Sequence, residues 1–404
     1  MRVLALGHMY PPQSFGGYEQ VWRAAMRYLE HRGHEVLVLT SDLDFGMPGA
    51  DDPNVRRELR LYWRPHYLPD MSAVARLRLE RHNARAFRRH IASFRPDVVT
   101  WWSMGGMSLS LIERVRRAGT PSLAFVHDDW LEYAPHMDGW LRPFRGRFSR
   151  FAAFAERLTG IPTSVDFARA ARYLFVSETT RRRAEEAGVR PLRSGIAHSG
   201  IDPLFLDPAP EREWRWSLLY VGRIDERKGV HTAVEALAHL PDAATLSVVG
   251  SWDDREEQRV METARRVGAL KRVRLMGQRT PAEVHAAYGQ ADVVVFPVIW
   301  EEPWGLVPLE AMGRGRPVVA TGRGGSGEYL RDGQNALLFE AGDEAALARA
   351  VVRLAGDPEL RRRLREAGLH TAPRHTQSEF DRAVLREVEA TTSSTDGRRA
   401  LQFE

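Results

Sequence analysis

The chain of 404 residues contains no cysteine. A disulfide framework, thiolate metal ligands and a cysteine nucleophile are therefore excluded, so any chemistry must use oxygen and nitrogen groups. No run of 18 apolar residues occurs either, and the sequence predicts no membrane-spanning helix. Because the N-terminal stretch MRVLALGHMY is typical of a strand and shows no charged leader, long apolar stretch or cleavage site, we expect a cytoplasmic protein.

Lysine is nearly absent: Lys228 and Lys271 are the only two, and arginine supplies the remaining positive charge. Residues 1–200 carry 30 arginines against 21 acidic residues, whereas residues 201–404 carry 28 basic against 32 acidic residues. This asymmetry favours an anionic partner for the first half, either a phosphorylated acceptor or an acidic lipid surface. A solvated arginine-rich surface explains it equally well, and we expect no nucleic acid among the partners.

Short apolar runs alternate with segments of helical periodicity along the whole chain, which is typical of parallel sheets covered by helices on both faces. Helices are predicted over Glu19–Arg32, closed by Gly33, and over Val230–Leu240. The fold class is therefore α/β, with two Rossmann-like doubly wound domains. The predicted strands are Arg2–Leu6, Glu35–Thr40, Asp97–Trp102, Ser122–Val126, Tyr173–Val176, Ser217–Val221, Thr245–Val249, Val273–Met276, Val293–Phe296 and Pro317–Ala320.

The length exceeds what one hydrophobic core usually supports, so two domains are expected. Prolines and acidic residues interrupt the periodicity over Ser199–Trp214 and mark the boundary. We predict a first domain over residues 1–200 and a second over residues 201–376. A last helix follows at residues 377–390, and the polar tail 391–404 is expected to be disordered.

The segment EEPWGLVPLEAMGRGRPVVATG places Glu302 and Glu310 directly after a strand, with seven residues between them. Pro303 and Gly305 predict a loop, with a helix from about Leu306. Ionised carboxylates accept several hydroxyl hydrogen bonds, so the two could hold two polyhydroxylated parts of one ligand. Backbone N–H groups of Trp304, Gly305 and Leu306 would complete the cradle. Taken alone, such glutamates are more often capping and surface residues.

The segment LLYVGRIDERKGV presents Arg223 and Lys228 after a strand and before a helix. Ligands of open α/β sheets bind outside the carboxyl ends of the strands, and two cations there could neutralise a diphosphate. Such pairs are often simply solvated. The rarity of lysine in this chain favours the functional interpretation of Lys228.

Three weaker signals lie at other strand ends. In GHMYPPQSFGGYEQ, Gly16 and Gly17 precede a helix that starts near Tyr18, and glycine there permits positive φ and close approach to a ligand. In LAFVHDDW, a buried-type strand ends in His127, Asp128 and Asp129, although a histidine in this position is more often structural. In TGRGGSGEYLRDG, a glycine-rich turn suits a phosphate, and Glu328 is expected to open the next helix.

Taken in order, these segments resemble the retaining GT-B glycosyltransferases of family four. The resemblance extends over nearly the whole chain, through HRGHEVLVLTSD, HDD, HSGIDPLF, GRIDERKG and GQRTPAEVHAAYGQADVVVFP to EEPWGLVPLEAMGRGRPVVATGRGGSGE. Its specificity comes from the ordered combination of GR…KG with the two glutamates. Trp304 departs from the family's more frequent phenylalanine, and His198-Ser199-Gly200 departs from asparagine-glycine, so the donor pocket could be reshaped.

The resemblance implies a nucleotide-diphosphate sugar as donor, a sugar-bearing acceptor, no cofactor and no metal. Arg223 and Lys228 would hold the diphosphate, Glu302 the transferred sugar and Glu310 the ribose. Gly16 and Gly17 would border the phosphates and His127 would face the reacting sugar. Gly277, Gln278 and Arg279 would lie beside the base, and helix 377–390 would pack on the first domain. The leaving phosphate itself would deprotonate the incoming hydroxyl.

Other functions on the same scaffold stay open. A nucleotide-sugar epimerase would release a free or altered sugar nucleotide without an acceptor. A non-catalytic sugar-nucleotide-binding protein would not need both the sugar-side glutamate and the cations. A phosphorylase would need pyridoxal phosphate on a lysine, and a dehydrogenase the dinucleotide glycine pattern, which is missing. The basic amphipathic segments SAVARLRLERHNARAFRRHIASF and GWLRPFRGRFSRFAAFAERL either rest peripherally on an anionic inner membrane surface, consistent with a lipid-linked glycan acceptor, or form ordinary surface helices.

Overall fold

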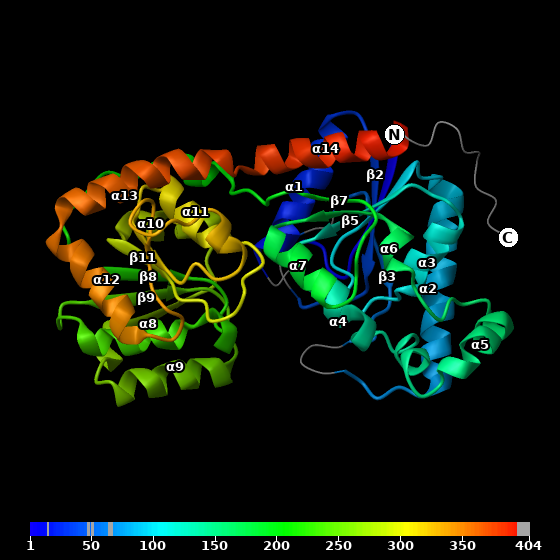
Figure 1. Ribbon diagram of the computed structural model, residues 1–404, viewed down its shortest axis with the longest axis horizontal. Helices are drawn as coiled ribbons and strands as arrows, with labels where there is room; N and C mark the ends of the chain where they lie inside the picture. Colours follow the sequence, from blue (N-terminus) through cyan, green and yellow to red (C-terminus); the bar gives the residue numbers. More distant parts are fainter. Residues whose placement is uncertain (14–15, 47–48, 50–51, 64–67, 394–404) are drawn as a thin grey trace. The chain divides into compact units, whose positions relative to one another are not determined.

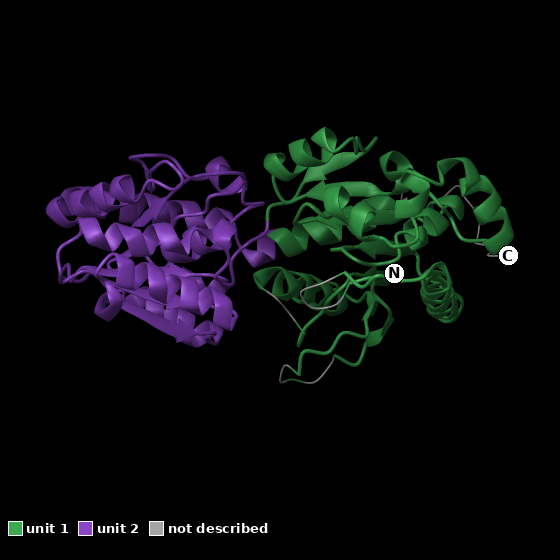
Figure 2. Ribbon diagram, turned by 90° about the horizontal axis from the view of Figure 1, so that it is seen from below, with its two compact units in different colours: residues 1–198, 380–404 green, residues 199–379 purple. Residues whose placement is uncertain are grey.

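The computed structural model describes residues 1–13, 16–46, 49, 52–63 and 68–393. The chain divides into two compact units, coloured separately in Figure 2. Unit 1 comprises Met1–His198 and Phe380–Glu404, and unit 2 comprises Ser199–Glu379. The interrupted segment Ser199–Trp214 thus lies at the start of unit 2.

Unit 1 is built on a parallel sheet with the strand order β3-β2-β1-β4-β5-β6-β7 (Figure 1). Its strands are β1 (Arg2–Leu6), β2 (Glu35–Ser41), β3 (Val55–Leu59), β4 (Val98–Trp101), β5 (Ser122–Val126), β6 (Arg172–Phe175) and β7 (Ser194–Ile196). Its helices are α1 (Gly17–His31), α2 (Ala73–Phe94), α3 (Ser110–Arg117), α4 (Trp130–Met137), α5 (Ala152–Thr159), α6 (Phe167–Ala170) and α7 (Glu178–Glu186).

Unit 2 repeats this plan with the strand order β10-β9-β8-β11-β12-β13. Its strands are β8 (Ser217–Val221), β9 (Thr245–Val249), β10 (Val273–Gly277), β11 (Val293–Phe296), β12 (Val318–Ala320) and β13 (Leu337–Leu338). Its helices are α8 (Val230–Ala236), α9 (Asp254–Arg266), α10 (Pro281–Gln290), α11 (Leu306–Gly313), α12 (Glu344–Gly356) and α13 (Pro358–Thr371). Helix α14 (Gln377–Ser393) begins in unit 2 and continues into unit 1.

Each strand order reverses direction once, between β1 and β4 in unit 1 and between β8 and β11 in unit 2. The pairs β1–β4 and β8–β11 are parallel, so loops that follow their carboxyl ends emerge at one edge of the sheet. Ligands of doubly wound sheets bind outside such a switch point. The α/β class with two Rossmann-like units is confirmed.

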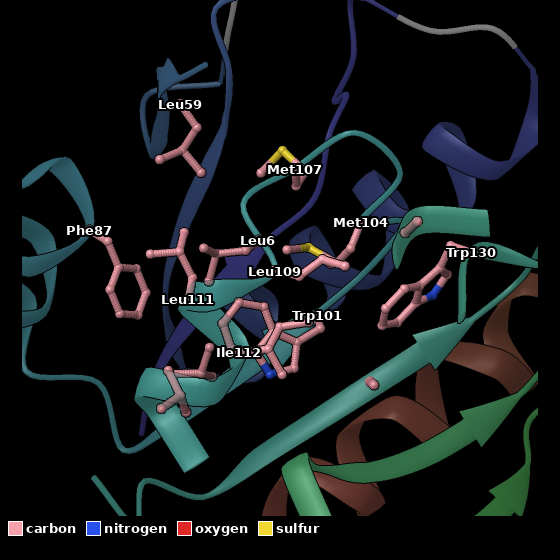
Figure 3. Close-up of a cluster of buried hydrophobic side chains, with 14 of the residues drawn as sticks. Leu6, Leu59, Phe87, Trp101, Met104, Met107, Leu109, Leu111, Ile112 and Trp130 are labelled. Atoms are coloured by element: carbon pink, nitrogen blue, oxygen red, sulfur yellow. The ribbon is translucent and has the colours of Figure 1, made fainter. Parts of the chain in front are cut away.

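The core of unit 1 is an aliphatic and aromatic layer between the sheet and its helices (Figure 3). Trp101 on β4 and Leu6 on β1 are fully buried, together with Leu111 and Ile112 on α3. All four residues of β4 are buried, and three of them are apolar, as expected for a strand covered on both faces. Such a core fixes the strand ends, and thereby the loops that extend from them.

Two details of the sequence analysis are wrong. Glu328 closes a short 3₁₀ helix, η7 (Gly325–Glu328), and opens no α-helix, because Arg331 to Asn335 form a hydrogen-bonded turn directly afterwards. The segment 391–393, predicted to be disordered, is the last turn of α14. Residues 394–404 of the predicted tail lie outside the described residues.

Candidate functional site

Lys228 and Glu302 meet at the switch point of unit 2. Lys228 follows β8, and Glu302 follows the neighbouring strand β11. The Lys228 Nζ donates to Glu302 Oε2 at 2.6 Å, and both side chains are largely buried, at 20% and 12% exposure. The structure therefore brings together a cation and a carboxylate that lie 74 residues apart in the sequence.

Trp300 completes this pair and was missed by the sequence analysis. Its Nε1 donates to the same Glu302 Oε2 at 2.8 Å, and the Arg227 guanidinium lies 4.5 Å from its ring centroid. The Lys228 Nζ is 5.6 Å from that centroid, within reach of a cation–π attraction. A tryptophan two residues before the glutamate, at the end of a strand, was the available signal.

Two glycines let the loops of this site approach one another. Gly229 adopts φ 68°, and a Cβ there would collide with the Pro297 carbonyl oxygen. Gly324 adopts φ 71°, and a Cβ there would collide with the backbone of Glu302, whose carbonyl accepts from Gly325 N at 2.7 Å. The glycine-rich turn thus fixes the backbone of Glu302.

Arg223 lies five residues before Lys228 and is partly exposed. Its Nε and Nη2 both donate to Asp225 Oδ2, at 3.0 and 2.8 Å. Asp225 also caps the 3₁₀ helix η4 (Glu226–Lys228) through the Lys228 backbone N–H. Asp225 therefore orients both the Arg223 fork and the turn that carries Lys228.

Helix α11 carries the second glutamate. Gly305 caps its first turn with φ 85°, and the Tyr329 hydroxyl donates to the Gly305 carbonyl. Glu310 lies one turn further on, where its Oε2 accepts from the Tyr288 hydroxyl at 2.7 Å. Burial raises the pKa of Glu310 to about 7, although the Tyr288 hydrogen bond opposes the shift.

The remaining predicted residues of unit 2 lie at the start of α11 and at the end of β10. The Trp304 indole is buried and donates to the Ser199 carbonyl at 2.8 Å, so it packs inward. Leu306 is the first residue of α11. Gly277, with φ 74°, is the last residue of β10, and Gln278 and Arg279 follow it. Arg279 pairs with Glu283 of α10 at 3.2 Å.

The predicted residues of unit 1 gather at the carboxyl edge of its own sheet. Neither Gly16 nor Gly17 uses the positive φ that glycine permits. Gly16 is extended and caps α1, with its N–H donating to Glu19 at 3.1 Å. A Cβ on Gly16 would meet no described atom within 4 Å. Gly16 could therefore serve a ligand by leaving open the space that a side chain would occupy.

His127 follows β5 among aromatic rings. The centroids of Tyr18, Trp102 and Phe380 lie 5.1, 5.9 and 5.2 Å from its own. Desolvation lowers the pKa of His127 to about 3, although part of the residue remains accessible. The imidazole is therefore neutral at physiological pH and can exchange hydrogen bonds without carrying charge.

Polar groups that the sequence analysis did not assign converge beside His127. Asp128 accepts from the Tyr133 hydroxyl at 2.6 Å and from Ser103 Oγ at 3.3 Å. The Ser103 N–H donates to the Tyr18 hydroxyl oxygen at 2.7 Å, and the His8 ring contacts the Ser103 carbonyl at 3.1 Å. Burial raises the pKa of Asp128. His8, Ser103 and Asp128 closely follow β1, β4 and β5, and these positions at strand ends were the signal that could have identified them.

A cavity of about 800 Å³ lies in unit 1 between α4, α7 and the segment around Thr163. Arg183, which lines it, bonds Asp129 at 2.8 Å and so connects the cavity to the HDD segment. Arginines and acidic residues balance around its wall: Arg145, Arg183, Arg190, Glu132, Asp166 and Glu186. This balance suits a neutral, hydroxyl-rich ligand better than a highly charged one.

Over the described ranges, no group of three histidines, aspartates or glutamates is arranged to hold a metal ion. In the same residues no helix is long and apolar enough to cross a membrane.

The two doubly wound units have the fold of solved GT-B glycosyltransferases, and the lysine–glutamate pair lies at the switch point of unit 2. Comparison with known families agrees: Glycosyltransferase Family 4 matches residues 15–204, and Glycosyl transferases group 1 matches residues 207–371. The chain belongs to this group 1/family 4 type of glycosyltransferase.

Curated relatives carry related activities. A glycogen synthase of Mycobacterium tuberculosis is 27% identical over 94% of this chain and 91% of its own. A phosphatidyl-myo-inositol mannosyltransferase of Mycobacterium leprae is 36% identical over 44% of this chain and 47% of its own, and the lipopolysaccharide core biosynthesis glycosyltransferase LpsE of Rhizobium meliloti is 37% identical over 38% and 44%.

Solved structures share the fold over nearly the full length. Sucrose-phosphate synthase of Thermosynechococcus elongatus superposes with a TM-score of 0.75 at 21% identity, covering 97% of this chain and 99% of its own. HepE of Anabaena in complex with UDP-glucose gives 0.69 at 18% identity, covering 96% and 100%.

Proposed function

We propose that this glycosyltransferase uses a nucleotide-diphosphate sugar as donor and transfers the sugar to an acceptor hydroxyl with retention of anomeric configuration. The observation that carries the proposal is the Lys228–Glu302 pair at the switch point of unit 2. A diphosphate needs a cation beside it, and the hydroxyls of the transferred sugar need a group that accepts their hydrogen bonds. The two groups must lie within a few ångströms of each other. The complex of HepE with UDP-glucose makes that nucleotide sugar the first donor to test.

In the proposed reaction, the bond from the anomeric carbon to the diphosphate oxygen breaks while the bond to the acceptor oxygen forms on the same face. The acceptor proton passes to the departing phosphate oxygen. Lys228 and Arg223 stabilise the negative charge that grows on this oxygen. Glu302 accepts hydrogen bonds from the sugar hydroxyls. It also keeps the Lys228 ammonium in place, and Trp300 fixes Glu302 by donating to the same oxygen.

Glu310 is assigned to the ribose hydroxyls, and the loop Gly277–Arg279 to the base. The backbone N–H groups of Trp304, Gly305 and Leu306, at the start of α11, are assigned to donate hydrogen bonds to anionic oxygens of the donor. Gly16 and Gly17 are assigned to the phosphates. Because its pKa is far below 7, His127 is assigned as a neutral hydrogen-bonding partner of a sugar hydroxyl rather than as a proton donor.

We further propose that no divalent metal and no organic cofactor is needed, because the two side-chain cations after β8 supply the charge that a metal would otherwise provide. Activity should then persist in EDTA. A strict requirement for added Mn²⁺ or Mg²⁺ would contradict this part of the proposal.

The acceptor is proposed to be a glycan, a lipid-linked glycan or a small hydroxylic molecule. The neutral cavity beside α4 and α7 supports an uncharged, hydroxyl-rich acceptor portion. The names of the mannosyltransferase and LpsE relatives, which refer to phosphatidyl-myo-inositol and to the lipopolysaccharide core, favour an acceptor of the cell envelope. We propose that the chain uses this acceptor from the cytoplasmic side, with peripheral membrane contact.

Lys228 offers the sharpest test, because Lys271 is a natural control. Lys228→Ala should lower turnover by about two to three powers of ten while the fold is retained. Lys271→Ala, an exposed residue on a turn before β10, should leave turnover unchanged. A normally folded Lys228→Ala enzyme with full activity would refute the assignment.

Donor choice should be read from thermal stabilisation by UDP-, GDP-, ADP- and dTDP-sugars. Product NMR then reports the anomeric configuration, and inversion would contradict retention. Consumption of the donor at equal rate without any acceptor would favour an epimerase, and donor binding without turnover on any acceptor would favour a non-catalytic binding protein.

A further inference from the structure

The segment Arg142–Gly160 of unit 1 exposes large apolar side chains in an unusual concentration. Phe148, Phe151, Phe154 and Leu158 are 43%, 46%, 67% and 73% exposed. The short helices η1 (Arg142–Arg145), η2 (Ser149–Phe151) and α5 contain no buried residue at all. A soluble surface rarely gathers such residues, and a contiguous apolar patch usually marks an interaction site.

Helix α5 is oriented opposite to an ordinary surface helix. Its inward face consists of small and polar residues, namely Ala152, Ala155, Glu156 and Thr159, at helical spacing. Its outward face carries Phe154 and Leu158, and Phe151, directly before the helix, extends this face at helical spacing. An amphipathic helix normally turns its large apolar side chains toward the core.

Specific polar contacts hold α5 in this orientation. The Glu156 carboxylate accepts from the Arg117 guanidinium of α3 and from the Thr163 backbone N–H, the latter at 3.1 Å. Arg114 of α3 donates to the Gly160 carbonyl at 2.7 Å, directly after the helix. The helix is therefore fastened through its polar side, and its apolar face cannot rotate inward without breaking these contacts.

The charge around the apolar face decides what covers it. Glu156 is the single acidic residue of the segment, and it is already paired with Arg117. Against it stand five exposed arginines: Arg142, Arg145, Arg147, Arg150 and Arg157. Arg147 and Arg150 lie 5.4 and 4.9 Å from the ring centroids of Phe148 and Phe151, so cations and rings share one surface. Arginines beside exposed aromatic rings match the interface of an anionic bilayer.

The positive charge continues onto neighbouring helices. Helix α2 packs on α3, and α3 in turn bonds the α5 segment through Arg114 and Arg117. Arg78, Arg81, Arg85 and Arg88 are exposed along one side of α2, at spacings of three and four residues. No acidic residue of α2 is exposed, since Glu80 is buried. Helix α2, 22 residues long, therefore adds a second group of exposed arginines to unit 1.

We infer that Arg142–Gly160 is a membrane-docking element, in which Phe148, Phe151, Phe154 and Leu158 enter the interface of an anionic lipid surface and the arginines bind its head groups. This inference rests on the proposed function for its purpose, because it names the surface on which a lipid-linked acceptor would be met. A second copy of the chain fits less well, since two such faces would bring ten arginines together.

The test is sedimentation of the full chain with vesicles of phosphatidylcholine, alone or mixed with phosphatidylglycerol. We expect binding to the anionic vesicles only, weakened by salt. Phe154→Ser combined with Leu158→Ser should lower the partition coefficient about tenfold or more. The matched control Leu192→Ser with Val352→Ser, at exposed apolar residues outside the segment, should change it less than about twofold.

Charge is tested separately. Arg147→Glu with Arg150→Glu should abolish most of the salt-sensitive binding, whereas Arg255→Glu with Arg363→Glu, exposed arginines of unit 2, should not. Absence of binding by the parent chain, or equal binding by all variants, would overturn the inference. So would sedimentation velocity showing a dimer that Phe154→Ser with Leu158→Ser dissociates, because the face would then be covered by a second copy.

Thermal stabilisation of each variant by UDP distinguishes failure of the docking element from failure of the proposed function. If UDP stabilises the chain but vesicles do not bind it, the docking element is wrong and the proposed function stands. If vesicles bind through Phe154 and Leu158 but no nucleotide stabilises the chain, the docking element stands and the donor assignment fails.

Discussion

Replacing Glu310 by glutamine should stabilise unit 2 at alkaline pH and weaken nucleotide binding. Burial raises the pKa of Glu310 from 4.5 to about 7, so ionising this carboxyl disfavours the folded state. Because the folded pKa lies above the unfolded one, the folded state is favoured below pH 4.5 and loses stability as the pH rises toward 7. Glutamine removes this loss and can still accept the Tyr288 hydrogen bond at 2.7 Å.

The magnitude follows from the two pKa values. At pH 8 the ionised carboxyl should lower the free energy of unfolding by up to about 3 kcal/mol, and at pH 5 by about 1 kcal/mol. For a unit of this size, each kcal/mol shifts the midpoint of thermal unfolding by about 2–4 °C. Glu310→Gln should therefore raise the midpoint of the UDP-responsive transition by several degrees at pH 8 and by much less at pH 5.

The functional half of the prediction has the opposite sign. An ionised carboxylate accepts two hydroxyl hydrogen bonds, and such charge-assisted bonds contribute about 1.5–3 kcal/mol each. If Glu310 holds the ribose, Glu310→Gln should weaken UDP binding about tenfold or more in calorimetric titration at pH 8. A more stable protein with weaker UDP binding is the joint expectation.

Glu283 on α10 is the control, because its exposed carboxylate caps the helix and hydrogen bonds from Thr280 lower its pKa. Glu283→Gln should therefore lower the thermal midpoint slightly at pH 8. Were Glu310→Gln to destabilise unit 2 at both pH values, or to shift the midpoint equally at pH 5 and pH 8, the assignment of a buried, proton-binding carboxyl would be refuted.

Two further predictions concern a glycine and a histidine. Gly229→Ala should destabilise unit 2 by several kcal/mol and lower turnover, because a Cβ would strike the Pro297 carbonyl. Gly268 is the control, since it has a similar φ of 70° but no described atom within 4 Å of a Cβ. Gly268→Ala should lower the free energy of unfolding in urea by only about 1 kcal/mol. His127→Gln should make unit 1 less sensitive to acid. Since the folded pKa of His127 is about 3, its neutral form stabilises the fold above pH 6.5, and this contribution is lost as the pH falls; at pH 5 the loss is about 2 kcal/mol. An unchanged pH dependence of the unit 1 transition would contradict the histidine prediction, and equal losses in both glycine variants would contradict the collision.

Most of the sheet could be predicted from sequence, because strands buried on both faces have uninterrupted apolar runs. Predicted strands such as Ser217–Val221 and Val293–Phe296 coincide with β8 and β11. The edge strands β3, β7 and β13 were missed. β3 reads VRREL and β7 reads SGI, so their polar and glycine residues resemble loops until a neighbouring strand supplies the hydrogen bonds.

The site could be predicted only in part. Lys228 and Glu302 stood out through the rarity of lysine and the spacing of the glutamates, but their direct ion pair depends on β8 and β11 being neighbours. Trp300 and Tyr288 were missed because their roles depend on side-chain direction, which one sequence does not encode as a pattern. The apolar segment around Phe154 had been noticed, but its outward orientation could not be inferred from periodicity, which normally places such residues inward.

The perturbed groups of the two units share one physical cause. Glu310 and His127 lie near the carboxyl edges of their own sheets, where loops shield them from water and disfavour charge. For the glutamate, this shielding opposes the ionised form that would bind a ribose, so a hydroxyl-rich ligand would supply the hydrogen bonds that water cannot. For the histidine, it enforces the neutral form that a sugar hydroxyl can meet without a charge. If Glu310 holds the ribose, hydrogen bonds from the nucleotide would offset the cost of ionising this carboxyl, and one residue would then lower the stability of unit 2 and raise its affinity for the nucleotide.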